Sequence, residues 1–190
     1  MRILMLGNSF TAANDLPQRL AQLTGAEVAA HTRGGARLAE QLNPKTKLGA
    51  KTLVALEGEP WDFVILQEMS HGPISSPQSF FTSAKRLCEW IHAKGATPVL
   101  FATWAYEKGG AKLAAKGWNY EDMARQLSAT YRQAARENHA LLAEVGQRFY
   151  DLSPTHPLYA ADGVHPNEAG TQLAAEVIAE TLLTHKELTP

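Results

Sequence analysis

Short apolar runs alternate along this chain with longer stretches of helical periodicity. The run 63–66, Phe-Val-Ile-Leu, is apolar at every position, which is typical of a strand buried on both faces. The run 3–6 has the same character. Strands are predicted at residues 3–6, 27–31, 61–66, 97–103 and 141–145.

The stretches between these runs have helical spacing. Residues 78–93 place Phe81, Leu87 and Ile91 on one apolar stripe, together with Cys88. Residues 119–138 open with Asn119 as a cap and an acidic first turn. Helices are predicted at residues 16–23, 36–56 in two pieces interrupted near Pro44, 78–93, 119–138 and 166–183, the last with Pro166 at its first position.

About five repeats of strand followed by helix predict an α/β fold with a parallel sheet and helices on both faces. The chain of 190 residues suits one domain, spanning 1–190, without internal repeats or linkers. The least regular stretch, 106–118, contains Gly109, Gly110 and Gly117, and is expected to be either a functional loop or the site of a short helix.

Charge and cysteine content exclude several classes of function. Lys and Arg total 18 against 19 for Asp and Glu, so the chain lacks the basic excess of a protein that binds nucleic acid or an anionic membrane. The single cysteine, Cys88, rules out an internal disulfide and a cysteine zinc site, and the histidines lack metal-ligand spacing. The first apolar run is too short for a signal peptide, so a cytoplasmic protein is expected.

Polar and glycine-rich segments follow the predicted strands. Because the carboxyl ends of parallel strands meet at one edge of a sheet, these segments are expected to form one site. They are residues 7–11, 33–35, 67–71, 104–106 and 162–166.

Three residues in these segments have the chemistry of nucleophilic catalysis. A serine becomes a nucleophile when a base takes its proton and a third group orients that base. Asp162 and His165 stand three residues apart just before the last predicted helix, and Ser9 follows the first strand. Ser9 is predicted as nucleophile, His165 as base and Asp162 as the group that orients it.

Acyl transfer also requires donors for a developing oxyanion. The backbone N–H of Ser9 is one candidate, and that of Gly34 or Gly35 is a second, because glycine allows close approach to the backbone. Gly35 and the side-chain amide of Gln67 complete the predicted donor set with Ser9.

These residues resemble the SGNH hydrolases, or GDSL-type esterases. Gly7-Asn8-Ser9 is similar to the family's first block, and Asp162-Gly163-Val164-His165-Pro166 is similar to its last block, Asp-x-x-His-Pro. The resemblance implies a flavodoxin-like three-layer α/β/α fold, the roles given above for the three residues, and no metal or organic cofactor. The chain departs from the usual pattern at Asn8, where Asp is common, and at Gln67, where the third block offers Asn.

The leading functional hypothesis is a serine esterase that hydrolyses short acyl esters, such as acetyl groups on carbohydrates or small esters. A thioesterase or lysophospholipase with the same three residues is one alternative. A non-catalytic binding module with a flavodoxin-like fold is another.

Each site residue also has a purely structural reading. Ser9 suits a helix cap, Asp162 a turn, and the glycines a turn. Gln67, Glu68 and His71 can be ordinary loop residues. Trp104 and Tyr106 either line a pocket or pack beneath the long loop.

Overall fold

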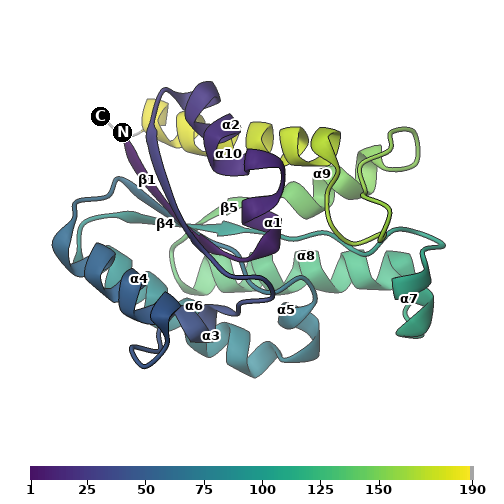
Figure 1. The fold of residues 1–190 in the computed structure, drawn as a ribbon, viewed down its shortest axis with the longest axis horizontal. Helices are drawn as coiled ribbons and strands as arrows, with labels where there is room; N and C mark the ends of the chain where they lie inside the picture. The colour runs from purple at the N-terminus through teal and green to yellow at the C-terminus, as the bar shows by residue number, and fades with distance from the viewer. Residues whose placement is uncertain (189–190) are drawn as a thin grey trace.

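The computed structural model describes residues 1–188, and its centre is a parallel sheet of five strands in the order β2-β1-β3-β4-β5 (Figure 1). All four strand pairs are parallel, which confirms the predicted α/β class. The strands are β1 (Arg2–Gly7), β2 (Glu27–Thr32), β3 (Phe63–Leu66), β4 (Thr97–Phe101) and β5 (Leu141–Ala143).

The register explains why the central strands are apolar throughout. Ile3 of β1 lies opposite Val28 of β2 on one side and Phe63 of β3 on the other. Every residue of β3 is buried, because helices cover both faces of the sheet. After β2 the chain crosses to the far side of β1, so a topological switch point lies between β1 and β3.

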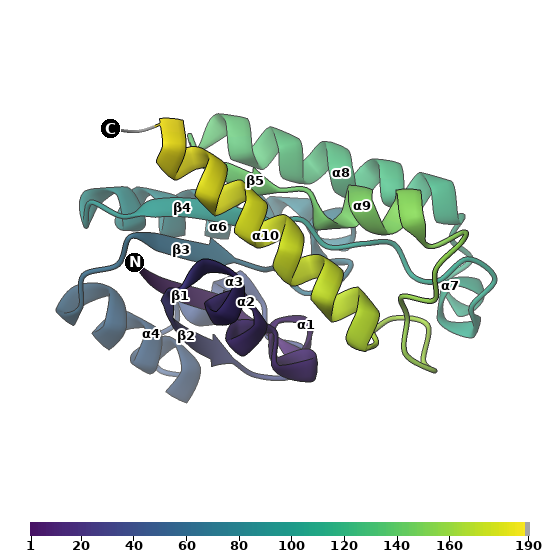
Figure 2. The same ribbon diagram turned by 90° about the horizontal axis from the view of Figure 1, so that it is seen from above.

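The long helices form one layer on each face of the sheet (Figures 1 and 2). On one face, α10 packs against both α2 and α9. These helices are α2 (Leu16–Thr24), α9 (Val145–Leu152) and α10 (Glu168–Leu188). On the other face are α3 (Leu38–Gln41), α4 (Lys47–Gly58), α6 (Pro77–Ala93) and α8 (Tyr120–Glu137).

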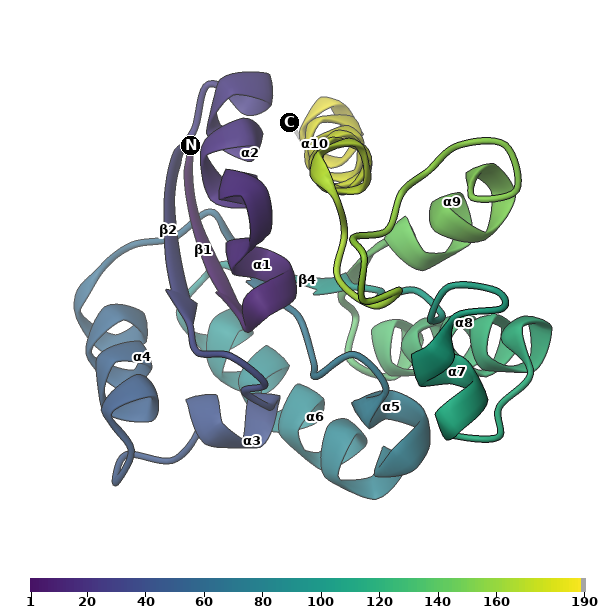
Figure 3. The same ribbon diagram turned by 45° about the vertical axis from the view of Figure 1, so that its right-hand side comes forward.

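Four short elements lie among the loops at the carboxyl ends of the strands (Figure 3). They are α1 (Ser9–Ala12), the 3₁₀ turn η1 (Ala13–Asp15), α5 (Gly72–Ser75) and α7 (Ala111–Ala115). α7 is the short helix left open as a possibility for 106–118. No helix within residues 1–188 is long and apolar enough to cross a membrane.

Most of the predicted helices are confirmed near their predicted bounds. The Asn119 side chain accepts a hydrogen bond from the Asp122 N–H and so caps α8 as expected. Cys88 is buried in the core, and burial raises the pKa of its thiol to about 12. The predicted break near Pro44 separates α3 from α4.

Two features near the C-terminus differ from the sequence predictions. The last helix begins at Glu168 and not at Pro166, because Asn167 is the cap and its Oδ1 accepts the Gly170 N–H at 2.9 Å. Pro166 instead forms an isolated antiparallel bridge with Tyr159. Helix α9 was not predicted, since its buried Val145 and Phe149 give too short a periodic pattern.

Candidate active site

Ser9 is the first residue of α1, directly after β1 at the switch point. The chain turns tightly between β1 and α1 because Asn8 caps the helix. The Asn8 Oδ1 accepts the Phe10 N–H at 3.1 Å. The Ser9 N–H lies in the first turn of a helix, where backbone N–H groups have no intrahelical acceptor. The turn therefore fixes the position of the Ser9 hydroxyl and presents a backbone donor beside it.

Asp162 and His165 lie on a loop between α9 and α10 that folds back on itself. Tyr159 pairs with Pro166, and the Ala160 N–H donates to the His165 carbonyl at 2.8 Å. Gly163, at the tip, has a φ of +65°, a conformation that favours glycine. This closed loop brings Asp162 and His165 to the carboxyl edge of the sheet.

The loop places the three predicted residues in one chain of hydrogen bonds. Ser9 Oγ lies 2.9 Å from His165 Nε2, across 156 positions of sequence. His165 Nδ1 lies 2.6 Å from Asp162 Oδ2. The arrangement of hydroxyl, imidazole and carboxylate is the one that activates a serine by general base catalysis.

Asp162 is held in its ionised form. Its Oδ1 accepts the backbone N–H groups of Val164 and His165, at 3.0 and 2.9 Å. Partial burial alone would raise the pKa of Asp162, but these bonds and the bond to the His165 ring outweigh it and lower the pKa to about 2. A carboxylate is therefore available to hold the Nδ1–H of His165 throughout the neutral range.

Stacked aromatic rings pack against the His165 imidazole. The Phe10 ring meets the His165 ring edge to face, with 5.4 Å between centroids. Trp104 stacks between Phe10 and Phe149, at 4.5 and 4.0 Å, and is 1% exposed. Its indole N–H donates to the Val164 carbonyl at 3.0 Å. Trp104 is therefore a packing residue that also fixes the loop carrying His165, and Tyr106 is buried as well.

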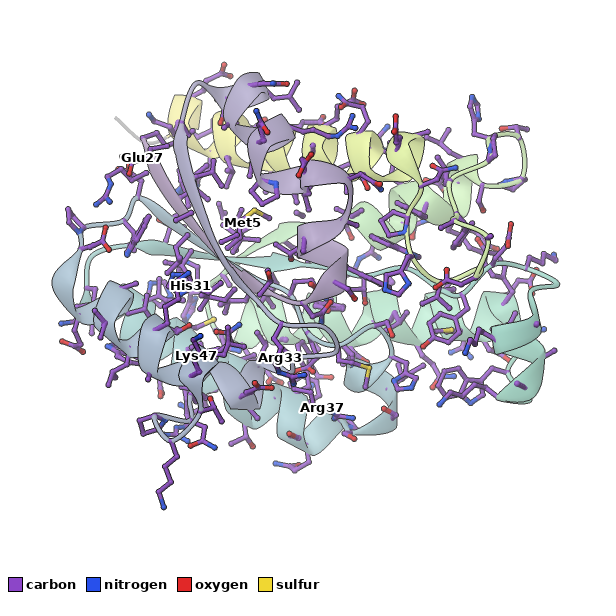
Figure 4. All side chains as sticks on the ribbon, viewed as in Figure 1. Met5, Glu27, His31, Arg33, Arg37 and Lys47 are labelled. Carbon is purple, nitrogen blue, oxygen red and sulfur yellow. The ribbon has the colours of Figure 1, made fainter. Side chains whose placement is uncertain are left out.

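The loop after β2 adjoins the Ser9 turn. Asn8 Nδ2 donates to the Ala36 carbonyl at 3.0 Å, which ties this loop to the residue before Ser9. Gly35 has a φ of +68° and is exposed, as is Gly34. Within residues 1–188, neither glycine N–H donates to a protein acceptor, so both are available to a ligand. Arg33, labelled in Figure 4, pairs with Glu40.

The structure gives Gln67 a different set of contacts from those expected of an oxyanion donor. Its Oε1 accepts the Asn8 N–H at 3.1 Å and the Thr11 hydroxyl at 2.9 Å. Its Nε2 donates to the Glu68 carbonyl, and the residue is 1% exposed. Gln67 is thus a buried brace between β3 and the Ser9 turn. From the end of β3, its amide reaches Asn8 and Thr11 in the segment after β1.

Two supporting residues were missed from sequence. Asn14, in η1, donates to the Pro166 carbonyl at 3.1 Å and to the Thr171 hydroxyl at 2.8 Å, joining the Ser9 segment to the loop of His165. The Asn8 side chain holds the same turn through two hydrogen bonds, one to the Ala36 carbonyl and one from the Phe10 N–H. The Asn14-Asp15 pair was a sequence signal for a turn at this place, because Asn tolerates the left-handed φ of 46° found here.

Glu68 binds backbone groups of two loops, which agrees with its interpretation as an ordinary loop residue. It is 3% exposed, and its carboxylate accepts the N–H groups of Leu38 and Met69 at 3.1 and 2.8 Å. Burial raises the pKa of Glu68, partly offset by these hydrogen bonds and by Arg37. The carboxylate connects the end of β3 to the loop after β2.

His71 lies farther along the same edge and has partners of its own. Lys116 Nζ lies 3.0 Å from His71 Nε2, and the Trp118 ring meets the imidazole edge to face. Burial and the charges of Lys116 and Arg37 lower the pKa of His71. Among the described residues, no group of three or more His, Cys, Asp or Glu side chains is arranged to hold a metal ion.

Comparison with solved structures gives similar folds over nearly the whole chain. A protein from Slackia heliotrinireducens, assigned as an SGNH hydrolase, is 54% identical, with a TM-score of 0.92 over 96% of this chain and 98% of that chain. A DUF4886 family protein from Bacteroides uniformis is 18% identical, with a TM-score of 0.76 over 97% and 83%. An acetylxylan esterase from Geobacillus stearothermophilus is 13% identical, with a TM-score of 0.68 over 95% and 93%.

Comparison with curated proteins gave no match. The model of the GDSL-like lipase/acylhydrolase family matches residues 5–173, which include both blocks of the sequence resemblance. The three-layer α/β/α fold agrees with that match. The chain therefore belongs to the GDSL-like lipase/acylhydrolase family, the SGNH hydrolases.

Proposed function

We propose that this protein is a serine esterase that hydrolyses short acyl esters, with O-acetyl groups on carbohydrates as the substrate class. The observation that carries the proposal is the pair of hydrogen bonds from Ser9 through His165 to Asp162, at 2.9 and 2.6 Å. Membership of a family of hydrolases supports ester hydrolysis in general.

The reaction begins when Ser9 Oγ attacks the ester carbonyl carbon and His165 Nε2 takes the hydroxyl proton. The Asp162 carboxylate stabilises the imidazolium that forms. His165 then gives the proton to the leaving alcohol, which leaves an acyl group on Ser9. Water, deprotonated by the same imidazole, attacks the acyl carbon and releases the acid and the free hydroxyl of Ser9.

The carbonyl oxygen becomes negative in each tetrahedral intermediate and requires preorganised donors. We assign this role to the N–H groups of Ser9 and of Gly35. Gly34 adjoins the same position. The N–H groups of both glycines are unused within residues 1–188, and Asn8 holds their loop against the Ser9 turn. Gln67 contributes indirectly, by fixing the N–H of Asn8.

The preference for a short acyl group rests on the packing beneath the site. The rings of Phe10, Trp104 and Phe149 are stacked beneath His165, so side chains fill the core in that direction. An acetyl group needs no apolar tunnel into the core, whereas a long acyl chain does. The acetylxylan esterase with this fold offers a precedent for carbohydrate esters.

Hydrolysis of p-nitrophenyl esters from acetate to palmitate tests the proposal. We expect the wild type to be most active on acetate, and Ser9→Ala to lose at least about three orders of magnitude in kcat. Ser79→Ala, which removes an exposed hydroxyl on α6, is the matched control and should keep full activity. A phosphonate ester should label Ser9 in the wild type.

Other results would select an alternative. A maximum on palmitate would indicate a lysophospholipase, and a preference for thioesters over matched oxygen esters would indicate a thioesterase. Absence of both turnover and phosphonate labelling would favour a non-catalytic binding module.

A further inference from the structure

A cavity of about 650 Å³ lies beside the segment that joins β4 to α7. Its walls come from three parts of the chain: residues 107–108, the start of α8, and residues 150–159 at the end of α9 and beyond. Ser9, Asp162 and His165 do not line it. Its volume lies in the range of about 300–1,000 Å³ that small-molecule sites occupy.

Two residues that line the cavity are also bonded to the loop that carries Asp162 and His165. Tyr159 lines the cavity and pairs with Pro166, the neighbour of His165. Glu107 also lines it, and its backbone N–H donates to the Gly163 carbonyl at 2.8 Å. The two segments run side by side at this end of the molecule (Figure 3). A ligand in the cavity therefore contacts two residues, Glu107 and Tyr159, that are bonded through their backbones to the loop of Asp162 and His165.

Two tyrosine rings give the cavity an aromatic wall. Tyr120 and Tyr150 are stacked, with 5.5 Å between centroids and 11° between planes. The Tyr120 hydroxyl is engaged with the Ser153 hydroxyl at 2.9 Å, which fixes this ring. Tyr150 is 37% exposed, so part of this large side chain is open to a ligand. Rings of this kind suit a ligand that has both an apolar face and a polar rim.

The charges of the lining disfavour an anionic ligand. Three carboxylates, those of Glu107, Glu121 and Asp151, face one cation, Lys108, and that cation is paired with Glu121 at 2.5 Å. Among residues 1–188, the Glu107 carboxylate has no hydrogen-bond or ion-pair partner, so it is a free acceptor for hydroxyl groups. Phosphates, sulfates and acidic sugars would be repelled, whereas a neutral sugar offers the hydroxyl donors that carboxylates accept.

We propose that this cavity is a glycan subsite, which binds a neutral sugar unit of an oligosaccharide whose ester lies at Ser9. A pyranose ring has C–H faces that can pack on Tyr150 and hydroxyls that can donate to Glu107. The inference rests on the proposed function and deepens it: the substrate is an acylated neutral oligosaccharide, held at a point away from its ester.

Binding to the protein is the first test, because it requires no turnover. Isothermal titration calorimetry with xylotetraose, cellotetraose and chitotetraose should detect binding of at least one by Ser9→Ala. Tyr150→Ala in the same background should weaken that binding about tenfold. Tyr150→Phe retains the ring and should bind as its parent does. Leu183→Ala removes an exposed apolar side chain from α10, away from the cavity, and should also bind normally.

Kinetics separate this inference from the proposed esterase activity. Tyr150→Ala should raise the KM for an acetylated oligosaccharide about tenfold while leaving p-nitrophenyl acetate hydrolysis within twofold of wild type. No binding of the three oligosaccharides, or equal binding by Tyr150→Ala and its parent, would overturn the glycan subsite even if the esterase is active. An inactive wild type that still binds an oligosaccharide through Tyr150 would overturn the esterase and retain the subsite.

Discussion

The side-chain oxygen of Gln67 accepts the backbone N–H of Asn8 at 3.1 Å, although 59 positions separate the two residues. The same oxygen accepts the Thr11 hydroxyl. A single buried amide thus holds both sides of the turn that presents Ser9, and it ties the segment after β1 to the neighbouring strand β3.

Replacing Gln67 by Leu should therefore reduce both stability and rate. The change leaves the Asn8 N–H and the Thr11 hydroxyl buried without their acceptor, at a cost of about 1–3 kcal/mol. We expect kcat for p-nitrophenyl acetate to fall more than KM changes, since the position of Ser9 shifts. Chemical denaturation and steady-state kinetics measure the two effects. Gln126→Leu, on the exposed face of α8, is the control and should change neither. A large rate loss with unchanged stability would instead assign Gln67 to the oxyanion.

Gly7 should tolerate no side chain. A Cβ at this position would lie 2.2 Å from Thr11 Oγ1 and 2.7 Å from Gln67 Oε1, within the same brace. Gly7→Ala should lower the free energy of unfolding by about 1–3 kcal/mol, the usual cost of overpacking. Gly34→Ala is the matched control, because a Cβ there meets nothing within 4 Å and its φ is not positive. Equal thermal stability of the two variants would contradict this account of the brace.

Asp162→Asn should slow hydrolysis by about two to four orders of magnitude. The amide cannot stabilise the imidazolium of His165 as a carboxylate does, and it can hold the ring in the wrong tautomer. Because the pKa of Asp162 is about 2, the carboxylate stays ionised as the pH is lowered from 7 to 4. Any loss of wild-type rate over that range must come from another group.

Stopped assays at pH 7 on wild type, Asp162→Asn and Asp15→Asn measure this effect. Asp15 is exposed and has a left-handed backbone that Asn also adopts, so its variant should retain full activity. An Asp162→Asn enzyme within tenfold of wild type would remove Asp162 from the proposed mechanism.

The buried His31 side chain should make the stability of the protein depend on pH. This side chain on β2, labelled in Figure 4, is 6% exposed, and its Nδ1 lies 3.2 Å from the Thr52 hydroxyl. Burial, with a smaller contribution from Lys51, lowers its pKa to about 4 from 6.5. Between these values the unfolded chain binds a proton that the folded chain does not. Stability should therefore be greatest above pH 6.5 and fall as the pH drops towards 4, by about 3 kcal/mol at most.

Urea denaturation at pH 7.5 and 4.5 tests the role of His31. His31→Gln should show a smaller difference in the free energy of unfolding between the two pH values than wild type. His139→Asn, at an exposed position with a positive φ, should retain the wild-type difference. An undiminished difference in His31→Gln would mean that other groups set the acid sensitivity.

The sequence by itself determined the α/β class, the positions of the five strands and the grouping of Ser9, Asp162 and His165 in one place. These depend on local pattern: β3 is apolar at every position because it is covered on both faces, and the interval from Asp162 to His165 places both side chains on one tight loop. Strand ends and helix bounds shifted by only a few residues, because caps such as Asn167 compete with their neighbours for the same role.

The tertiary structure alone decided the contacts of Gln67, the packing of Trp104 and the bond from Asn14 to Pro166. Each depends on a contact between segments far apart in sequence, and the partner of a buried polar group is set by which strands become neighbours. The cavity beside Tyr150 is likewise assembled from three segments that only the fold brings together.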